Sequence, residues 1–273
     1  AQAICTGEQM ANLTVTGYVG SIVKWQSSTD NFGSSISDIA NTTATLTGAS
    51  QGALTQDTWY RVVVQSGSGC TIVNSNVIKI TVNQSSNVSN FAVSSSNVCA
   101  GGVASVTVNS TTLANGTYTV SYALTGANAA SGLTASLVMN SNTGSFSTPA
   151  LNATGTTTVT INALENSAGC TSNITAGNTV AITVTAGPSV SITGADNVCV
   201  GGSVTLTANP SGGSGSATGY QWERSANGGG SWTTVQNTTA ITYATNSGLS
   251  TGNYLYKVTL TQSGANCSAV SSN

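Results

Sequence analysis

Apolar residues alternate with small polar residues over many short stretches of the chain. In residues 78–82, for example, Ile and Val alternate with Lys and Thr, which places the apolar side chains on one face of an extended strand. Similar stretches, separated by turns rich in Gly, Asn and Ser, follow one another at intervals of about 8 to 12 residues. No long segment has apolar residues at the spacing of an amphipathic helix. The pattern therefore predicts an all-β protein without helices.

The same order of motifs occurs three times along the chain. Each repeat begins with a cysteine that is followed, two residues later, by a glycine and then by an alternating strand. Each repeat has a second cysteine after a turn of small residues, before the place of the last strand. The cysteines in chain order are Cys5, Cys70, Cys99, Cys170, Cys199 and Cys267. A period of this length predicts three tandem domains, comprising residues 1–84, 85–186 and 187–273.

The two outer repeats are expected to be incomplete at the ends of the sequence. Few residues precede Cys5, whereas strand-like residues precede Cys99 and Cys199, so the first domain is expected to lack its opening strand. The sequence ends soon after Cys267, so the third domain is expected to lack its closing strand. We therefore expect a longer array that continues in both directions.

Aromatic residues at one position of each repeat indicate which sandwich this is. Trp25 and Trp222 lie 20 and 23 residues after their leading cysteines, and Tyr122 takes that position in the middle repeat. The third strand of an immunoglobulin sandwich carries its core tryptophan at this place. Tyr60 and Val62 resemble the Tyr-x-Cys of the sixth strand, with valine in place of the core cysteine. The chain is therefore predicted to form tandem immunoglobulin-like β-sandwich domains with core aromatics at Trp25, Tyr122 and Trp222.

Disulfide bonds are the expected role of the six cysteines, because no pair has the spacing of a zinc or redox site. Two arrangements remain open. Pairing within repeats would join Cys5 to Cys70, Cys99 to Cys170 and Cys199 to Cys267. In an immunoglobulin sandwich, however, these two positions lie at opposite ends of the domain, and bridged Cα atoms must lie within about 7 Å. Pairing across the junctions would join Cys5 to Cys170 and Cys99 to Cys267, with Cys70 and Cys199 bound to further repeats.

Charge and composition exclude several classes of function. Charged residues make up only 4% of the chain, the net charge is −2, and histidine is absent. Scattered single bases do not suit nucleic acid or an anionic membrane surface, and no apolar run is long enough to span a bilayer. The few acids form no evident pair, and a serine hydrolase would need a histidine base. We expect neither an enzyme nor a cofactor or metal site.

Exposed aromatic residues are the candidates for ligand binding, because sugar rings stack on Trp and Tyr. With Trp25 and Trp222 assigned to cores, Trp59 and Trp232 are the possible glycan contacts. The competing interpretation, which we favour, is that both rings pack at the margin of a sandwich.

Three features resemble the immunoglobulin-like repeats of giant bacterial cell-surface adhesins that are exported by the type IX secretion system, including gliding-motility adhesins. They are the Cys-x-Gly opening, the Gly-Cys before the last strand, and the segment Trp-Glu-Arg-Ser-Ala-Asn-Gly-Gly-Gly-Ser-Trp at residues 222–232. The middle repeat departs from the pattern because it lacks the tryptophan. The resemblance implies a long filament on the bacterial surface that contacts polysaccharide or substratum.

The leading functional hypothesis is a structural and adhesive segment of a long extracellular repeat protein, whose partners are neighbouring repeats and surface polysaccharide or substratum. An array of glycan-binding modules is the second hypothesis. The third is a set of accessory domains attached to a secreted enzyme.

Overall fold

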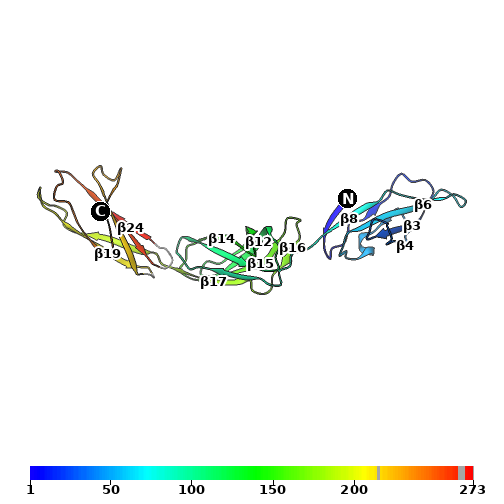
Figure 1. The fold of residues 1–273 in the computed structure, drawn as a ribbon, viewed down its shortest axis with the longest axis horizontal. Coiled ribbons are helices and arrows are strands. Elements are labelled where there is room, and N and C mark those ends of the chain that lie inside the picture. Colours follow the sequence, from blue (N-terminus) through cyan, green and yellow to red (C-terminus); the bar gives the residue numbers. More distant parts are fainter. Residues whose placement is uncertain (214–215, 264–267, 273) are drawn as a thin grey trace. The chain divides into compact units, whose positions relative to one another are not determined.

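The computed structural model describes residues 1–213, 216–263 and 268–272, and these are almost entirely β-structure (Figure 1). The one helical element among them is a short 3₁₀ turn, η1 (Gly48–Gln51). The strands assemble into tandem immunoglobulin-like β-sandwiches, as the sequence predicts. The described part of the chain contains no helix with the length and apolar content needed to span a bilayer.

Two compact units make up the chain. The first contains residues 1–88 together with 116–119 and 163–173, and the second contains residues 89–115, 120–162 and 174–273.

The first unit is built around one sandwich. Its larger sheet has the strand order β1-β8-β6-β3-β4, with β7 paired to β6, and its smaller sheet consists of β2 and β5. Buried side chains from both sheets, among them Leu13, Leu46 and Ile80, form the core between them. The strands are β1 (Gln2–Cys5), β2 (Leu13–Thr14), β3 (Ser21–Ser28), β4 (Ser37–Ile39), β5 (Thr45–Leu46), β6 (Thr58–Gln65), β7 (Ile72–Asn74) and β8 (Ile78–Asn83).

The first sandwich begins with a strand at its edge. β1 runs parallel to β8, so that Gln2 lies opposite Ile80 and Cys5 lies opposite Asn83. In the next sandwich β10 (Val98–Cys99) pairs with β17 (Thr179–Thr185) in the same parallel manner. β1 is therefore the counterpart of β10, and not of the opening strand at residues 92–95 that precedes β10 in the second sandwich.

The second sandwich places its strands in two sheets. One has the order β10-β17-β15-β12-β13 with β16 on β15, and the other has the order β14-β11-β9. The rings of Tyr122 and Phe146 lie 5.0 Å apart between them. The strands not yet given are β9 (Ala92–Ser95), β11 (Gly102–Asn109), β12 (Gly116–Gly126), β13 (Ala130–Met139), β14 (Thr143–Leu151), β15 (Gly155–Glu165) and β16 (Thr171–Asn173).

The third sandwich has sheets of order β18-β19-β22 and β21-β20-β23-β24. Its strands are β18 (Pro188–Thr193), β19 (Thr205–Gly212), β20 (Ala217–Ser225), β21 (Thr233–Thr238), β22 (Thr242–Ala244), β23 (Leu255–Gln262) and β24 (Ser268–Ser272). β24 pairs with β23 from Thr261 to Lys257. β24 pairs back onto β23 as β7 does onto β6 and β16 onto β15, so it is the counterpart of these short strands and not of the closing strand β8 or β17.

Candidate functional site

A disulfide joins the first predicted repeat to the second. Cys5 ends β1, and Cys170 follows the turn between β15 and β16. Their sulfur atoms are bonded at 1.99 Å and their Cα atoms are 5.6 Å apart, although 165 residues separate them in sequence. The Cα distance is typical of disulfides. Cys170 is fully buried, so the bond lies in a closed contact rather than on a free surface.

Hydrogen bonds support the disulfide on both sides. The Asn166 side chain donates to the Gln84 carbonyl at 2.9 Å, next to Asn83, whose carbonyl accepts from the Thr6 amide at 2.9 Å. The Asn166 side-chain oxygen also accepts from the Cys170 amide at 3.0 Å, which holds the turn in shape. The end of β8 is therefore hydrogen-bonded to the β15–β16 turn beside the disulfide that joins Cys5 to Cys170.

The pairing of Cys5 follows the junction arrangement, and the within-repeat pairing of Cys5 with Cys70 is wrong. The physical reason is the parallel pairing of β1 with β8. This pairing sets Cys5 beyond the end of β6 that begins at Thr58, whereas Cys70 follows the other end, at Gln65. The length of β6, about 23 Å, separates those two ends.

The remaining cysteines divide into two groups. Cys99 is disulfide-bonded, and Cys267, which the junction arrangement would assign to it, lies outside the described residues. Among the described cysteines, Cys70 and Cys199 are free and exposed.

The three core aromatics are buried. Trp25 is 3%, Tyr122 3% and Trp222 0% exposed. Trp25 Nε1 donates to the Thr43 carbonyl at 3.0 Å. The Trp222 ring stacks on Tyr243 with centroids 5.7 Å apart.

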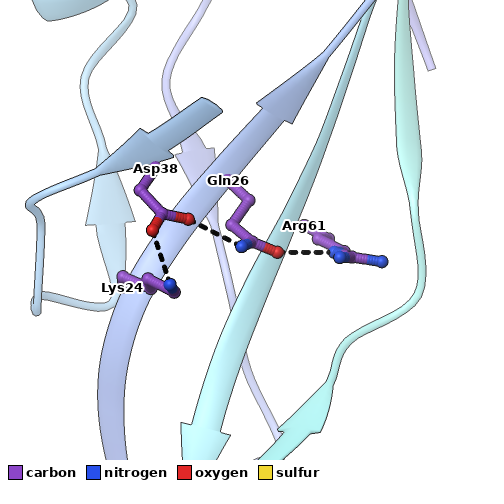
Figure 2. Close-up of polar contacts among 4 residues, drawn as sticks. All are labelled: Lys24, Gln26, Asp38 and Arg61. Atoms are coloured by element: carbon purple, nitrogen blue, oxygen red, sulfur yellow. Dashed lines mark hydrogen bonds and ion pairs between the residues drawn. The ribbon is translucent and has the colours of Figure 1, made fainter. Parts of the chain in front are cut away.

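The outward face of the larger sheet of the first sandwich holds a chain of polar contacts (Figure 2). The Lys24 ammonium and an Asp38 oxygen are 2.6 Å apart, and the other Asp38 oxygen accepts from the Gln26 amide at 2.7 Å. The Gln26 carbonyl in turn accepts from Arg61 Nε at 2.8 Å. These side chains stand on three adjacent strands, β4, β3 and β6, so the contacts tie the strands together on the outside of the sheet.

Aromatic rings cover two of the cations of this face. The Arg61 guanidinium lies 4.0 Å from the centroid of the Phe32 ring, and the Lys79 ammonium lies 5.1 Å from that of Trp59. Lys79 also forms a 2.6 Å ion pair with Asp57. Arg61 and Lys79 thus each have a polar partner and an aromatic ring, and the negative face of the ring attracts the cation.

The carboxylates of this face are held in their charged form. The hydrogen bond from Lys24, followed by that from Gln26, lowers the pKa of Asp38. The hydrogen bond from Lys79, followed by the Val82 amide, lowers the pKa of Asp57. A general acid near neutral pH needs a raised pKa instead, so these carboxylates have the electrostatics of structural ion pairs.

The third sandwich repeats the arrangement. Lys257 forms a 2.8 Å ion pair with Glu223 and lies 4.7 Å from the centroid of the Trp232 ring. Glu223 and Lys257 are cross-strand partners, as are Gln26 and Arg61 in the first sandwich. Both sandwiches therefore place a cation at the same register, with an acceptor on the neighbouring strand and an aromatic ring over it.

The loop that supplies the ring has the same hydrogen bonds in both sandwiches. In the first, the Ser28 hydroxyl donates to Asp30 and accepts from the amide four residues on, while Asp30 accepts from the Ser34 amide at 2.7 Å. In the third, Ser225 and Asn227 make the equivalent contacts, and Asn227 accepts from the Ser231 amide at 2.9 Å. We call these two segments, residues 28–35 and 225–232, the stapled loops.

The backbone of the stapled loops matches as well. Asn31 and Phe32 have φ values of 58° and 63°, and the equivalent Gly228 and Gly229 have 69° and 91°. A Cβ at Gly229 would lie 3.7 Å from the Trp232 ring. Trp232 therefore fills the space that the side chain at the Phe32 position would take, which explains how rings from different loop positions cover equivalent cations.

Trp59 and Trp232, the possible glycan contacts, are half-buried, and each has a lysine ammonium over its ring. The sequence predicted neither the cation–aromatic pairs nor the stapled loops. The signal for the loops was present in the shared spacing of Ser, Asp or Asn, and Ser. Among the described residues, no group of three side chains is placed to hold a metal ion.

A family model described as "Domain of unknown function (DUF8696)" matches residues 1–84 and 189–273, which together are more than half of the chain. The chain belongs to this family. The two DUF8696 segments are those that carry the core tryptophans, the stapled loops and the cation–aromatic pairs. The DUF8696 match does not include residues 85–188, and the middle repeat contains neither lysine nor arginine.

Solved structures with similar architecture include a titin fragment (domains A168-A170), with 15% identity, a TM-score of 0.34, and coverage of 98% of this chain and 93% of that one. The FN1–FN3 domains of chicken CNTN1 have 12% identity and a TM-score of 0.35, with 98% of each chain covered. Likenesses at these scores are too weak to carry an argument about function. No curated protein matches the chain.

Proposed function

We propose that this DUF8696 chain is a structural and adhesive segment of a long extracellular repeat protein, the stalk of a bacterial surface filament or adhesin. The observation that carries the proposal is the disulfide between Cys5 and Cys170, which joins consecutive repeats instead of closing one of them. A bond within a repeat would stabilise an independent domain. A bond between repeats also connects the array covalently.

The value of such a bond lies in the path that tension takes. If the chain is pulled from its ends, force passes from Cys5 through the sulfur atoms to Cys170 and bypasses residues 6–169 between them. The strands within that span are not themselves pulled out, because the bond carries the tension past them. A stalk that holds a distal adhesive tip needs this resistance to extension.

The proposed role is non-catalytic. The acids and bases of the sheet faces are paired with one another, as in Lys24 with Asp38 and Lys257 with Glu223, and these pairs tie strands together. We place the protein outside the cell, because disulfides form and persist in oxidising compartments. The proposed partners are neighbouring repeats, with surface polysaccharide or substratum as the target of the whole filament.

Single-molecule stretching of the full chain from its two ends tests the proposal. The comparison uses a Cys99→Ser background, in which Cys5–Cys170 is the disulfide under test. In this background, replacing Cys5 by Ser as well is expected to increase the fully unfolded contour length by about 550 Å. The increase follows because each residue released from the closed loop adds about 3.4 Å. The added variant Cys70→Ser, which removes a free cysteine, is the control and leaves the length unchanged.

Equal contour lengths with and without Cys5 would contradict the mechanical role.

A further inference from the structure

The two free cysteines, Cys199 and Cys70, occupy positions equivalent to those of Cys5 and Cys170 in the disulfide-bonded junction. Cys199 opens the third repeat as Cys5 opens the first. In both places the cysteine carbonyl accepts from the amide three residues on, at 3.0 Å from Glu8 and 2.9 Å from Gly202. The glycine in each turn has a positive φ, 88° at Gly7 and 85° at Gly201, so the two turns have the same backbone shape.

Cys70 corresponds to Cys170. Each follows a short turn after a long strand, β6 or β15, and precedes a short strand, β7 or β16, that pairs back onto it. The equivalent position is fully buried at Cys170 and exposed at Cys70. The hairpin at Cys70 therefore exposes the surface that is buried in the equivalent hairpin at Cys170.

Exposed apolar side chains lie beside both free cysteines, which is a second and independent observation. Val198 and Val200 flank Cys199 and are 53% and 74% exposed, and Ile72 and Val73 follow Cys70 at 58% and 59%. In the formed junction, Ile4 and Thr6 take the places of Val198 and Val200 and are half-buried. Ser172 takes the place of Ile72 and is only 8% exposed.

A pocket adjoins Cys199 as well. It is lined by residues 198–202 on one side and by Leu249 and Tyr254 on the other. A partner that approaches Cys199 can therefore cover Val198 and Val200 and seat an apolar side chain in this pocket.

We propose that the Cys70 hairpin of one molecule docks on the Cys199 turn of a second copy of the chain, and that a disulfide then joins these two residues. The proposal rests on the proposed function, because it extends the repeat-to-repeat junction from within one chain to two chains. The two surfaces differ, so the contact is head-to-tail. Repeated docking gives an open-ended polymer.

The bond forms by thiol–disulfide exchange with a small-molecule disulfide, glutathione disulfide in the test. The Cys70 thiolate attacks one glutathione sulfur, which gives a mixed disulfide and releases one glutathione thiolate. The Cys199 thiolate of the docked partner then attacks the Cys70 sulfur and releases the second glutathione thiolate. Two protein thiols are oxidised and lose their protons, while one glutathione disulfide is reduced to two glutathione molecules.

The experiment uses two complementary variants of the full chain, Cys70→Ser and Cys199→Ser, at micromolar concentration in a glutathione redox buffer. Each variant retains one half of the proposed junction. Docking raises the local thiol concentration, so disulfide-linked dimer is expected to form about tenfold faster in the equimolar mixture than in either variant alone. Non-reducing electrophoresis measures the dimer, and peptide mapping is expected to find Cys199 linked to Cys70.

The unmodified chain is expected to form a ladder of multimers under the same conditions. A Val198→Ser and Val200→Ser double variant should slow the ladder while the amides of β20 keep their protection from hydrogen exchange, which shows that the third sandwich remains folded. Dimerisation of single variants as fast as that of the mixture, or a mixture that stays monomeric, would overturn the proposal. Neither result would affect the stretching test of the proposed function, which depends on Cys5 and Cys170 alone.

Discussion

Gln26 and Arg61 are cross-strand partners joined by a 2.8 Å hydrogen bond, and the third sandwich places an ion pair at the same register. There Glu223 takes the place of Gln26 and Lys257 that of Arg61. In both sandwiches an aromatic ring from the adjacent stapled loop covers the cation. The pair is therefore a shared part of the outer face of both sandwiches, with either a neutral or a charged acceptor.

Replacing the acid of each ion pair, Glu223 with Lys257 or Asp38 with Lys24, tests how much the pair contributes to stability. We expect Glu223→Gln to lower the free energy of unfolding by about 1 kcal/mol, and Asp38→Asn to lower it by less. The reason is exposure: the Lys257 and Glu223 side chains are 22% and 17% exposed, against 31% and 57% for Lys24 and Asp38. Urea denaturation at low and high salt measures both effects. Equal costs for the two variants would contradict this interpretation.

The stapled loop of the first sandwich should make its stability depend on pH. The Ser34 amide, followed by the Ser28 hydroxyl, holds the pKa of Asp30 well below its usual value. The folded state therefore binds this proton at lower pH than the unfolded chain does. The stabilisation is present above the unfolded pKa of about 4 and is lost as the pH falls below it.

Asp30→Asn supplies the matched variant, because Asn227 already makes the equivalent contacts in the third sandwich. Urea midpoints between pH 7 and pH 2 should fall less steeply in Asp30→Asn than in the unmodified chain. Identical slopes in the two proteins would show that Asp30 does not contribute.

Removing the junction disulfide should destabilise the chain. Cys170→Ser is expected to lower the free energy of unfolding by about 2 to 5 kcal/mol, since the bond closes a long loop and Cys170 is buried. Cys70→Ser, at an exposed free cysteine, should change it by no more than about 0.5 kcal/mol. Guanidinium unfolding under non-reducing conditions measures both, and a Cys170→Ser variant as stable as Cys70→Ser would refute the expectation.

The two core tryptophans should respond differently to the same substitution. Trp25 Nε1 donates to the Thr43 carbonyl, whereas Trp222 Nε1 has no hydrogen-bond partner within the described part of the chain. Trp25→Phe is therefore expected to cost about 1 kcal/mol more than Trp222→Phe. Hydrogen-exchange mass spectrometry of peptides from β3 and β20 reports each sandwich separately. A larger loss of protection in β20 would contradict the prediction.

The sequence was informative wherever a feature depends on one repeat alone. Alternation predicted the strands, and the spacing from Cys5 to Trp25 and from Cys199 to Trp222 identified positions that are buried in the structure. Features that depend on several strands were harder to predict. Gln26, Phe32 and Arg61 look like isolated residues in the sequence, and only the pairing of β3 with β6 brings them together.

The disulfide shows the same limit. Both pairings were compatible with two cysteines in each repeat, and the choice depended on which ends of the strands meet. The parallel pairing of β1 with β8 decides it, because it carries Cys5 to Asn83 and away from the β6–β7 hairpin. Short parallel pairings of this kind have no tight turn between the strands, so no local sequence motif predicts them.

The asymmetric junction also bears on how such arrays change during evolution. Cys5 contributes the leading half of one junction, and Cys170 contributes the hairpin half from the following repeat. A repeat that carries both halves can be duplicated or deleted by recombination at its boundaries, and the cysteines on either side of the change still find complementary partners. The number of repeats in an array can therefore change without leaving an unpaired cysteine at the site of recombination.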